Sequence, residues 1–276
     1  MSFLDSCGAD LRTKNGLGCT PIWIAAGYDH LNCLKYLIEK IMADDHNSLE
    51  QCLLDANDTG DTPVLAACSK GNIDICKYLL ESMDNLDTKR KLLRTANKAG
   101  DTALKVAVAG GQDINLLRLL LDADLSIHQS ELANSEEMCI NRKNNLGLSP
   151  LIIASERNLP DVVQLLIQYN ADVRICDDKG RHALAVASFC GCEDVVKFLL
   201  SRIKESPSVA SLLNETDNKG CSSIWLAART GSLSMVKLLI ESGADETIAD
   251  DEGVTPMEVA SKFKKEKVFK YLQERQ

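Results

Sequence analysis

One glycine recurs along the chain at related intervals, and this repeat limits the fold more than any other feature. Its seven copies are Gly18, Gly60, Gly100, Gly147, Gly180, Gly220 and Gly253. Successive gaps are 42, 40, 47, 33, 40 and 33 residues, so two gaps equal 33 and the others exceed it by 9, 7, 14 and 7. A fixed period of this size is the signature of a stacked-repeat protein. We therefore interpret the chain as seven copies of a 33-residue unit with insertions.

Each copy carries the signals of a turn followed by two helices. Asn or Asp stands three residues before every repeat glycine, and such side chains bond to the backbone of a turn. Two residues after the glycine, four copies have a Thr-Pro or Ser-Pro helix start: Thr20-Pro21, Thr62-Pro63, Ser149-Pro150 and Thr255-Pro256. The first helix is expected to end in the left-handed conformation at Gly71, Gly111, Gly191, Gly231 and, in one copy, Asn158. Apolar residues at helical spacing, as at 195–200, predict the second helix.

This unit resembles the ankyrin repeat, and the resemblance covers nearly the whole chain. It implies an all-α fold: a solenoid of stacked antiparallel helix pairs with β-turn-like tips. Two departures from the family pattern occur. The His that ends the family's TPLH motif is absent from every copy, and the copies at Gly180 and Gly220 read GRHAL and GCSSI in place of Thr-Pro. We expect these changes to affect local stability and leave the fold intact.

The repeats predict a single domain over residues 1–276. Its units are expected at about 15–56, 57–96, 97–143, 144–176, 177–216, 217–249 and 250–276, after a partial repeat at 1–14. Because packed helices lie about 8–10 Å apart, seven layers would extend roughly 60 Å.

The insertions carry their own pattern. Three of them place a Leu-Leu pair before the next turn, which predicts an extended second helix or an extra helical turn along the outer edge. The longest, between Leu125 and Asn145, is polar, and we expect a mobile surface loop there.

Composition excludes several function classes. The net charge is −9, from 40 acidic and 31 basic residues, which argues against a general nucleic-acid binder. No apolar run is long enough to cross a bilayer, so no membrane partner is expected. The eleven cysteines lie mostly singly among apolar neighbours. We interpret them as reduced core residues of a cytoplasmic or nuclear protein.

The sequence shows no catalytic or cofactor motif beyond residues that the repeat explains. Cys190 and Cys192 form a CxC pair without the further ligands of a zinc site, and the four histidines lie in different repeats. We expect no enzyme activity, no cofactor and no metal. A cysteine-dependent enzyme, with Cys and His meeting in space, is the alternative from another class.

Partner contacts are expected at the turn tips and on the inner face of the first helices, as the family resemblance implies. Trp, Tyr and Arg carry much of the binding energy at interfaces. The candidate residues are Trp23, Tyr28, Lys70, Arg157, Arg181, Phe189, Trp225 and Arg229. The two tryptophans occupy the position of the missing His, so filling the groove between neighbouring helices is an equal interpretation for them.

These features predict a non-catalytic, monomeric scaffold or adaptor that binds a protein along its concave face. Residues 258–276 carry +3, which leaves −12 for the rest, so one form is an acidic escort for a basic client. A second form is a substrate-recruiting arm of a larger protein such as a ubiquitin ligase or kinase. A third is a spacer between flanking domains.

Overall fold

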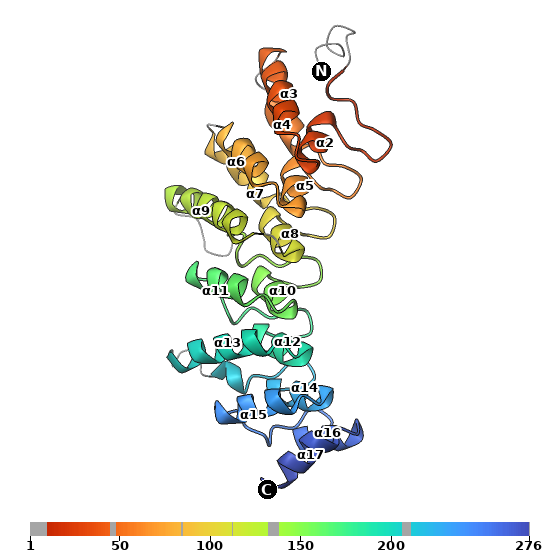
Figure 1. Ribbon diagram of the computed structural model, residues 1–276, viewed down its shortest axis with the longest axis vertical. Helices are drawn as coiled ribbons and strands as arrows, with labels where there is room; N and C mark the ends of the chain where they lie inside the picture. Colours follow the sequence, from red (N-terminus) through yellow and green to blue (C-terminus); the bar gives the residue numbers. More distant parts are fainter. Residues whose placement is uncertain are drawn as a thin grey trace. The chain divides into compact units, whose positions relative to one another are not determined.

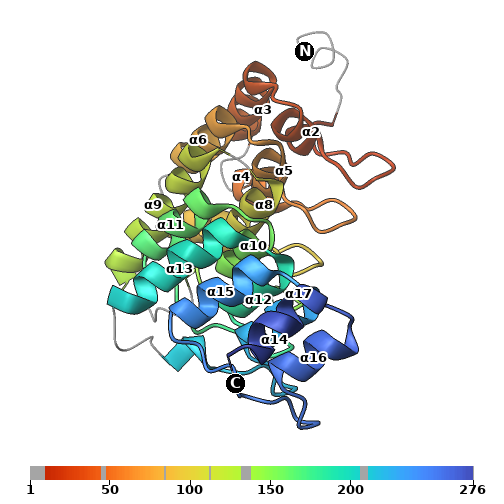
Figure 2. The same cartoon turned by 60° about the horizontal axis from the view of Figure 1, so that its bottom comes forward.

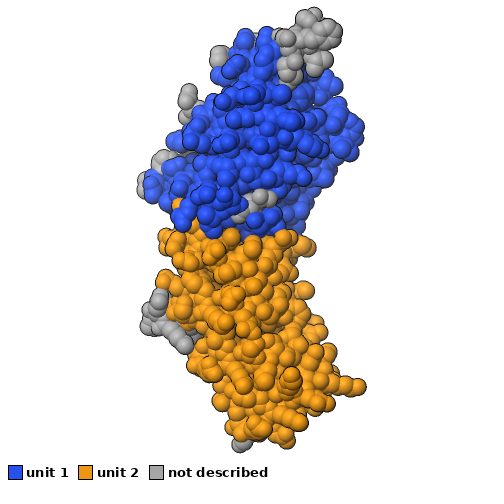
Figure 3. Space-filling model, in the orientation of Figure 1, with its two compact units in different colours: residues 1–145 blue, residues 146–276 orange. Residues whose placement is uncertain are grey.

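The chain folds into two compact units, residues 1–145 (unit 1) and 146–276 (unit 2), in the computed structural model (Figure 3). The structure describes residues 10–44, 48–83, 85–111, 113–131, 138–205 and 211–275, and within these it contains helices and turns but no strand. The boundary between the units falls in the turn that opens the expected fourth repeat. Residues 1–9 of the expected partial repeat lie outside the described residues.

Among its described residues, unit 1 contains three helix pairs and two additional helices. Its inner helices, α2, α5 and α8, pack each on the next, and each also packs on the helix that follows it (Figure 1). The bounds are α2 (Pro21–Gly27), α3 (Leu31–Asp44), α4 (Ser48–Leu54), α5 (Pro63–Lys70), α6 (Ile73–Glu81), α7 (Leu86–Arg94), α8 (Ala103–Gly110) and α9 (Ile114–Glu131).

The described part of unit 2 contains four helix pairs. Its inner helices, α10, α12, α14 and α16, form the same kind of row, with α11, α13, α15 and α17 packed beside them (Figure 2). The bounds are α10 (Pro150–Glu156), α11 (Pro160–Gln168), α12 (Ala183–Cys190), α13 (Glu193–Glu205), α14 (Ser223–Thr230), α15 (Leu233–Glu241), α16 (Pro256–Lys262) and α17 (Glu266–Gln273). The predicted all-α fold of stacked helix pairs is confirmed.

The helix starts follow the predicted capping chemistry. In the copies with Thr-Pro or Ser-Pro, the Thr or Ser side chain accepts a hydrogen bond from the backbone N–H of the residue three positions later. These N-cap residues are Thr20, Thr62, Ser149 and Thr255. In the copy that reads Thr102-Ala103, the Thr102 side chain makes no cap bond. In the copies at Gly180 and Gly220, His182 Nδ1 accepts from the N–H of Ala185 and Ser222 Oγ accepts from that of Trp225, at 3.3 and 3.4 Å. Both helices therefore keep an N-cap despite the changed motif.

The first helices end as predicted at Gly71, Gly111, Gly191 and Gly231, which have φ between 63° and 89°, and at Asn158, with φ 54°. In the first and last repeats the same position holds Asp29 and Lys264, with φ 59° and 56°. The turn after the first helix is therefore kept even where a side chain has to adopt the left-handed conformation.

Backbone hydrogen bonds join the tips of neighbouring repeats. The N–H of the residue after the turn Asx donates to a carbonyl of the preceding tip at 2.9–3.1 Å. The donor and acceptor pairs are Asp58 to Leu17, Lys98 to Thr59, Asn145 to Ala99, Asn218 to Lys179 and Asp251 to Lys219. We call these bonds the tip ladder. They fix the register of neighbouring turns without using side chains.

The three insertions with Leu-Leu pairs add helical structure, as predicted. Two of them form α4 and α7, which pack on each other, and the third contains a short 3₁₀ turn at 211–213. Their leucines are buried, including Leu53, Leu92, Leu93, Leu212 and Leu213. The insertions therefore widen the hydrophobic core.

The longest insertion differs from the expected mobile loop. Helix α9 continues through its first part to Glu131, and Cys139 and Ile140 at its end are buried. Residues 132–137 lie outside the described part. The expectation was therefore wrong for both ends of the insertion, whose apolar residues are packed.

A buried ion pair holds the end of this insertion. Arg94 Nε donates to Asp124 Oδ1 at 2.9 Å, and Asp124 Oδ2 accepts the backbone N–H of Cys139 at 2.7 Å. Arg142 also donates to the Arg94 carbonyl, at 2.6 Å. The pair thus connects α7, α9 and the returning chain.

Candidate protein-interaction surfaces

The first repeat exposes a cluster of apolar side chains beside an open hollow of about 420 Å³. Leu17 and Tyr28 are 69% and 66% exposed, and Ile24 is exposed as well. All three line the hollow together with Trp23, and Asp58 lies at its edge. We call this set the unit 1 hollow. Its mixture of aromatic, aliphatic and acidic groups suits a protein side chain.

Both tryptophans reach across to the next repeat. Trp23 Nε1 donates to the carbonyl of Asp61 at 2.8 Å, and Trp225 Nε1 donates to that of Val254 at 2.9 Å. Trp225 is only 6% exposed, whereas Trp23 is half-buried. The indoles therefore fill the groove between neighbouring repeats, which was the alternative to a binding role. Trp23 also presents part of its ring to the unit 1 hollow.

A second open hollow, of about 410 Å³, lies between the turns and inner helices of the last two repeats (the unit 2 hollow). The guanidinium of Arg229 lies over two rings there, 5.9 Å from the centroid of Trp225 and 5.2 Å from that of Phe263. Helix α14 carries Trp225 and Arg229, and Phe263 follows α16; the two helices lie side by side (Figure 2). The arrangement holds a cation at the edge of the hollow.

Arg181 and Phe189 form a related pair one repeat earlier. The Arg181 guanidinium lies 5.9 Å from the Phe189 ring centroid, and its Nη2 donates to Asp177 Oδ2 at 2.7 Å. The Arg181 side chain is only 17% exposed. The exposed Phe189 ring is the more accessible of the two groups.

The two remaining candidates stand at the ends of inner helices. Lys70 is the last residue of α5, and Arg157 follows α10; both side chains are exposed. Within the described chain, Arg157 forms no ion pair. The structure thus brings Trp23 and Tyr28 together in unit 1 and Trp225 and Arg229 in unit 2, while Lys70 belongs to neither hollow.

Sequence reasoning missed three exposed apolar residues of these hollows, Leu17, Ile24 and Phe263. Leu17 and Ile24 look like ordinary repeat positions, since exposure does not follow from residue type. Phe263 could have been found from its place in the repeat, because it aligns with Arg157, a candidate binding residue.

Several cysteines lie where burial raises the pKa of the thiol. Burial raises the pKa of Cys139, Cys192 and Cys221, with a value of about 12 for Cys221. In the exposed Cys190, partial burial also raises the pKa. A catalytic thiol needs a lowered pKa. These pKa shifts therefore do not favour the cysteine-dependent enzyme.

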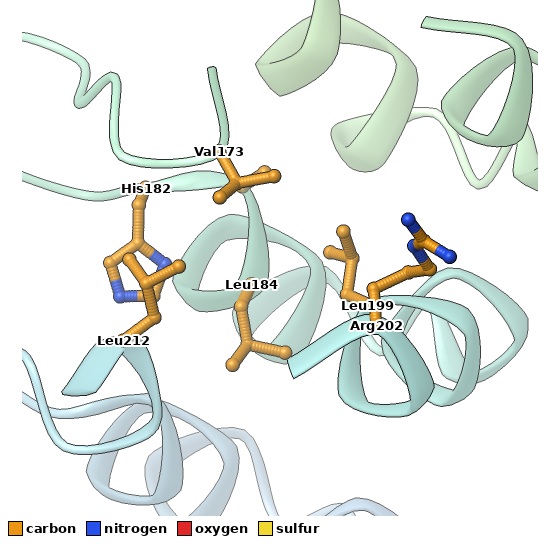
Figure 4. A pocket seen from close by; sticks show the side chains of 7 residues that line it. Val173, His182, Leu184, Leu199, Arg202 and Leu212 are labelled. Carbon is orange, nitrogen blue, oxygen red and sulfur yellow. The ribbon is translucent and has the colours of Figure 1, made fainter. Parts of the chain in front are cut away.

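His182 borders a small cavity of about 20 Å³, and Figure 4 shows its ring beside Leu212. Burial lowers the pKa of His182 to about 4, so the ring is neutral at pH 7 and its Nδ1 is free to cap α12. The cavity has room for about one water molecule. We interpret it as a packing defect around a structural histidine.

In the part of the chain that the structure describes, no group of three His, Cys, Asp or Glu side chains lies close enough together to hold a metal ion. No helix in that part of the chain is long and apolar enough to cross a membrane.

Comparison with known proteins gives the family. The model described as "Ankyrin repeats (3 copies)" matches residues 1–91, 41–131, 130–209 and 201–276. Human "Ankyrin repeat domain-containing protein 63" is 26% identical over 180 residues, which is 65% of this chain and 43% of that protein. Human "NF-kappa-B inhibitor alpha" is 32% identical over 106 residues, 38% of this chain and 33% of that protein. The chain thus spans less than half the length of these relatives.

A solved structure supports the fold. The crystal structure of the ankyrin repeat domain of Bcl-3, whose description calls it a unique member of the IkappaB protein family, has a TM-score of 0.72 to this chain. The match covers 93% of this chain and 99% of that one at 23% identity. At this identity the likeness concerns the fold alone.

Proposed function

The chain belongs to the ankyrin repeat family, and we propose that it is a non-catalytic protein-binding module whose partner contacts the unit 1 hollow. Residues 1–276 would act as one domain of seven repeats. Because the ten described cysteines are all free thiols, we place this module in the cytoplasm or nucleus. The related proteins lend support at the level of the family, since ankyrin repeats generally mediate protein–protein interaction.

The observation that carries the proposal is the exposed apolar cluster of the first repeat. Leu17 and Tyr28 each expose about two thirds of their surface, and Ile24 lies with them around one hollow. Contiguous exposed apolar patches typically mark interaction sites. A Tyr or Trp at the centre of such a patch is a typical hot spot, and Tyr28 and Trp23 occupy that place here.

The charges around the unit 1 hollow favour a basic partner, in agreement with the escort form expected from the sequence. Asp58 lines the hollow, and the exposed Asp29 follows Tyr28 directly. An apolar side chain could enter the hollow while a neighbouring Lys or Arg pairs with these carboxylates. Binding should then weaken as salt rises.

The experiment is affinity capture from a cell extract with the intact chain as bait and mass spectrometry as readout. The test variant is the double substitution Ile24→Ser and Tyr28→Ser. The matched control is Leu86→Ser, because Leu86 is similarly exposed at 43% but lies on α7, away from the hollow.

We expect the double variant to lose a specific protein that wild type and Leu86→Ser both retain. A hot-spot residue is worth about 2 kcal/mol or more, so the loss should be at least tenfold. Identical sets of captured proteins for all three baits would refute the proposed site. Capture that is unchanged between low and high salt would refute the basic-partner form alone.

A further inference from the structure

The turn of the first repeat contains the pair Asn15-Gly16, which is the one Asn-Gly sequence in the chain. Both residues are exposed. The Asn15 side chain holds the turn, because its Oδ1 accepts the backbone N–H groups of Leu17 and Cys19 at 2.9 and 3.0 Å. Asn15 and Leu17 also line the unit 1 hollow. A chemical change at Asn15 would therefore act on that hollow directly.

The backbone nitrogen of Gly16 is open to reaction. At the equivalent position of later repeats the N–H belongs to the tip ladder, as in the bonds from Asp58 to Leu17 and from Lys98 to Thr59. Within the described residues the Gly16 N–H has no hydrogen-bond partner. An added Cβ on Gly16 would meet no described atom within 4 Å, and glycine has no side chain of its own to shield the nitrogen.

The side-chain amide nitrogen of Asn15 is equally unrestrained. In two later repeats this nitrogen is held by the preceding tip: Asn97 Nδ2 donates to Asp61 Oδ1 at 2.8 Å, and Asn144 Nδ2 donates to Asp101 Oδ1 at 2.9 Å. Among the described residues Asn15 Nδ2 has no such acceptor. The two N–H groups on Asn15 Oδ1, in contrast, face the oxygen that gains negative charge when a nucleophile adds to the carboxamide carbon. The turn thus combines an accessible nucleophile, a free leaving group and a stabilised oxyanion.

We propose that Asn15 is a deamidation site and that its isoaspartate product disrupts the first turn beside the unit 1 hollow. The Gly16 nitrogen forms a bond to Asn15 Cγ and gives its proton to water. The bond from Cγ to Nδ2 then breaks, Nδ2 takes up a proton, and ammonia leaves behind a five-membered succinimide. Water adds to one of the two ring carbonyls and opens the ring to aspartate or to isoaspartate. Water is the co-reactant throughout, and no oxidation or reduction occurs.

The two products differ in how they fit the turn. An aspartate Oδ1 accepts both turn N–H groups in three later repeats, at Asp177, Asp217 and Asp250. Isoaspartate adds one methylene to the main chain and shortens the carboxylate arm by the same methylene, so the N–H groups of Leu17 and Cys19 lose their acceptor. The exposed Leu17 then shifts within the hollow. The effect on partner binding rests on the proposed function, whereas the chemical step does not.

The test incubates the intact chain at mildly alkaline pH beside a synthetic peptide of residues 12–20, until the peptide has converted completely. Peptide mapping by mass spectrometry locates each deamidated residue, and a methyltransferase specific for isoaspartate labels that product. The internal controls are Asn57 and Asn97, which occupy the same turn position but precede residues with side chains. The matched variant is Gly16→Ala, because Gly16 does not have a positive φ and a Cβ there has room.

We expect more deamidation at Asn15 than at Asn57 or Asn97, with isoaspartate among the products. Gly16→Ala should slow the reaction about tenfold, since about 1.4 kcal/mol of added crowding in the transition state lowers a rate by that factor. An intact chain that stays unmodified at Asn15 after the peptide has converted overturns the deamidation site. Equal rates in wild type and Gly16→Ala overturn it as well.

Hydrogen–deuterium exchange of residues 15–19 tests the disruption of the turn. The three samples are the fresh chain, the isoaspartate-containing chain and freshly prepared Asn15→Asp. We expect faster exchange in the isoaspartate-containing chain alone, because aspartate keeps both turn bonds, and equal exchange in all three samples overturns the disruption. In the capture experiment described above, the isoaspartate-containing chain should lose the protein that the Ile24→Ser, Tyr28→Ser variant loses. Mapping and exchange need no partner, so they stand or fall independently of the proposed function.

Discussion

The repeat glycines allow the close contact between neighbouring tips to be tested with a matched pair of substitutions. Gly147 and Gly253 occupy the same place in their repeats, with φ of 73° and 78°. A Cβ on Gly147 would lie 2.5 Å from the backbone nitrogen of Asp178 and 2.2 Å from its Oδ1. A Cβ on Gly253 would meet no atom of the described chain within 4 Å. The two sites therefore share backbone strain, and Gly147 alone adds a clash with the following repeat.

The expected losses follow from this difference. An alanine in the left-handed conformation costs about 1–2 kcal/mol, which is the whole effect expected for Gly253→Ala. Overpacking adds about 1–3 kcal/mol, so Gly147→Ala should lower the free energy of unfolding by about 2–5 kcal/mol. The measurement is urea unfolding in a Trp23→Phe background, because Trp225 is then the sole tryptophan and reports on unit 2.

A third variant separates backbone from side-chain clash. Adding Asp178→Ala to Gly147→Ala removes the carboxylate but leaves the backbone nitrogen in place, so most of the extra loss should persist. Equal losses for Gly147→Ala and Gly253→Ala would refute the reasoning, since they would mean that neighbouring tips are not held in contact.

Three further predictions concern buried charges. The pKa of His182 is about 4 in the folded chain and about 6.5 in the unfolded chain, so the unfolded chain binds the proton more tightly. The free energy of unfolding should therefore fall by about 3 kcal/mol as pH drops from 6.5 to 4. His182→Thr should remove this pH dependence in acid titrations followed by circular dichroism. Asp124→Ala leaves Arg94 buried without its carboxylate and should lower the free energy of unfolding by about 3–5 kcal/mol, measured with urea. The double variant Arg94→Met and Asp124→Leu should lose much less, because no buried charge remains. Equal losses would contradict the ion-pair argument. Lys105 is fully buried, and burial lowers its pKa to about 8. Lys105→Leu should therefore raise the free energy of unfolding by about 2 kcal/mol at pH 7. If this gain in stability does not shrink as pH rises from 8 to 10.5, the buried charge is not its cause.

The sequence allowed the repeat units and most helix ends to be predicted, because these depend on local chemistry. Thr62 caps α5 and Asn158 takes the left-handed turn through bonds to residues a few positions away. The contact of Arg94 with Asp124 spans 30 residues and belongs to an insertion, so no repeat pattern points to it. The left-handed conformation of Lys264 could not be predicted either, because Lys is uncommon at such a position and its presence does not indicate a turn.

For the proposed interaction surfaces, the sequence supplied candidate residues but not their accessibility. Trp225 and Arg229 were both candidates, yet the indole is buried and the guanidinium is exposed. Arg181 was chosen on the same grounds as Arg229, but its carboxylate partner lies within its own repeat. Such differences depend on the neighbouring turn, which composition does not describe.

The tip ladder also bears on how chains of this type diversify. A bond between a main-chain N–H and a main-chain carbonyl can be made by almost any amino acid, so a tip substitution that does not crowd the neighbouring turn leaves this bond between modules in place. Duplication or loss of a whole module would leave donor and acceptor matched at the new junction. Surface chemistry at each tip is therefore open to variation, and one architecture can supply an apolar hollow with exposed leucine and tyrosine in one module and an aromatic hollow with charges of both signs in another.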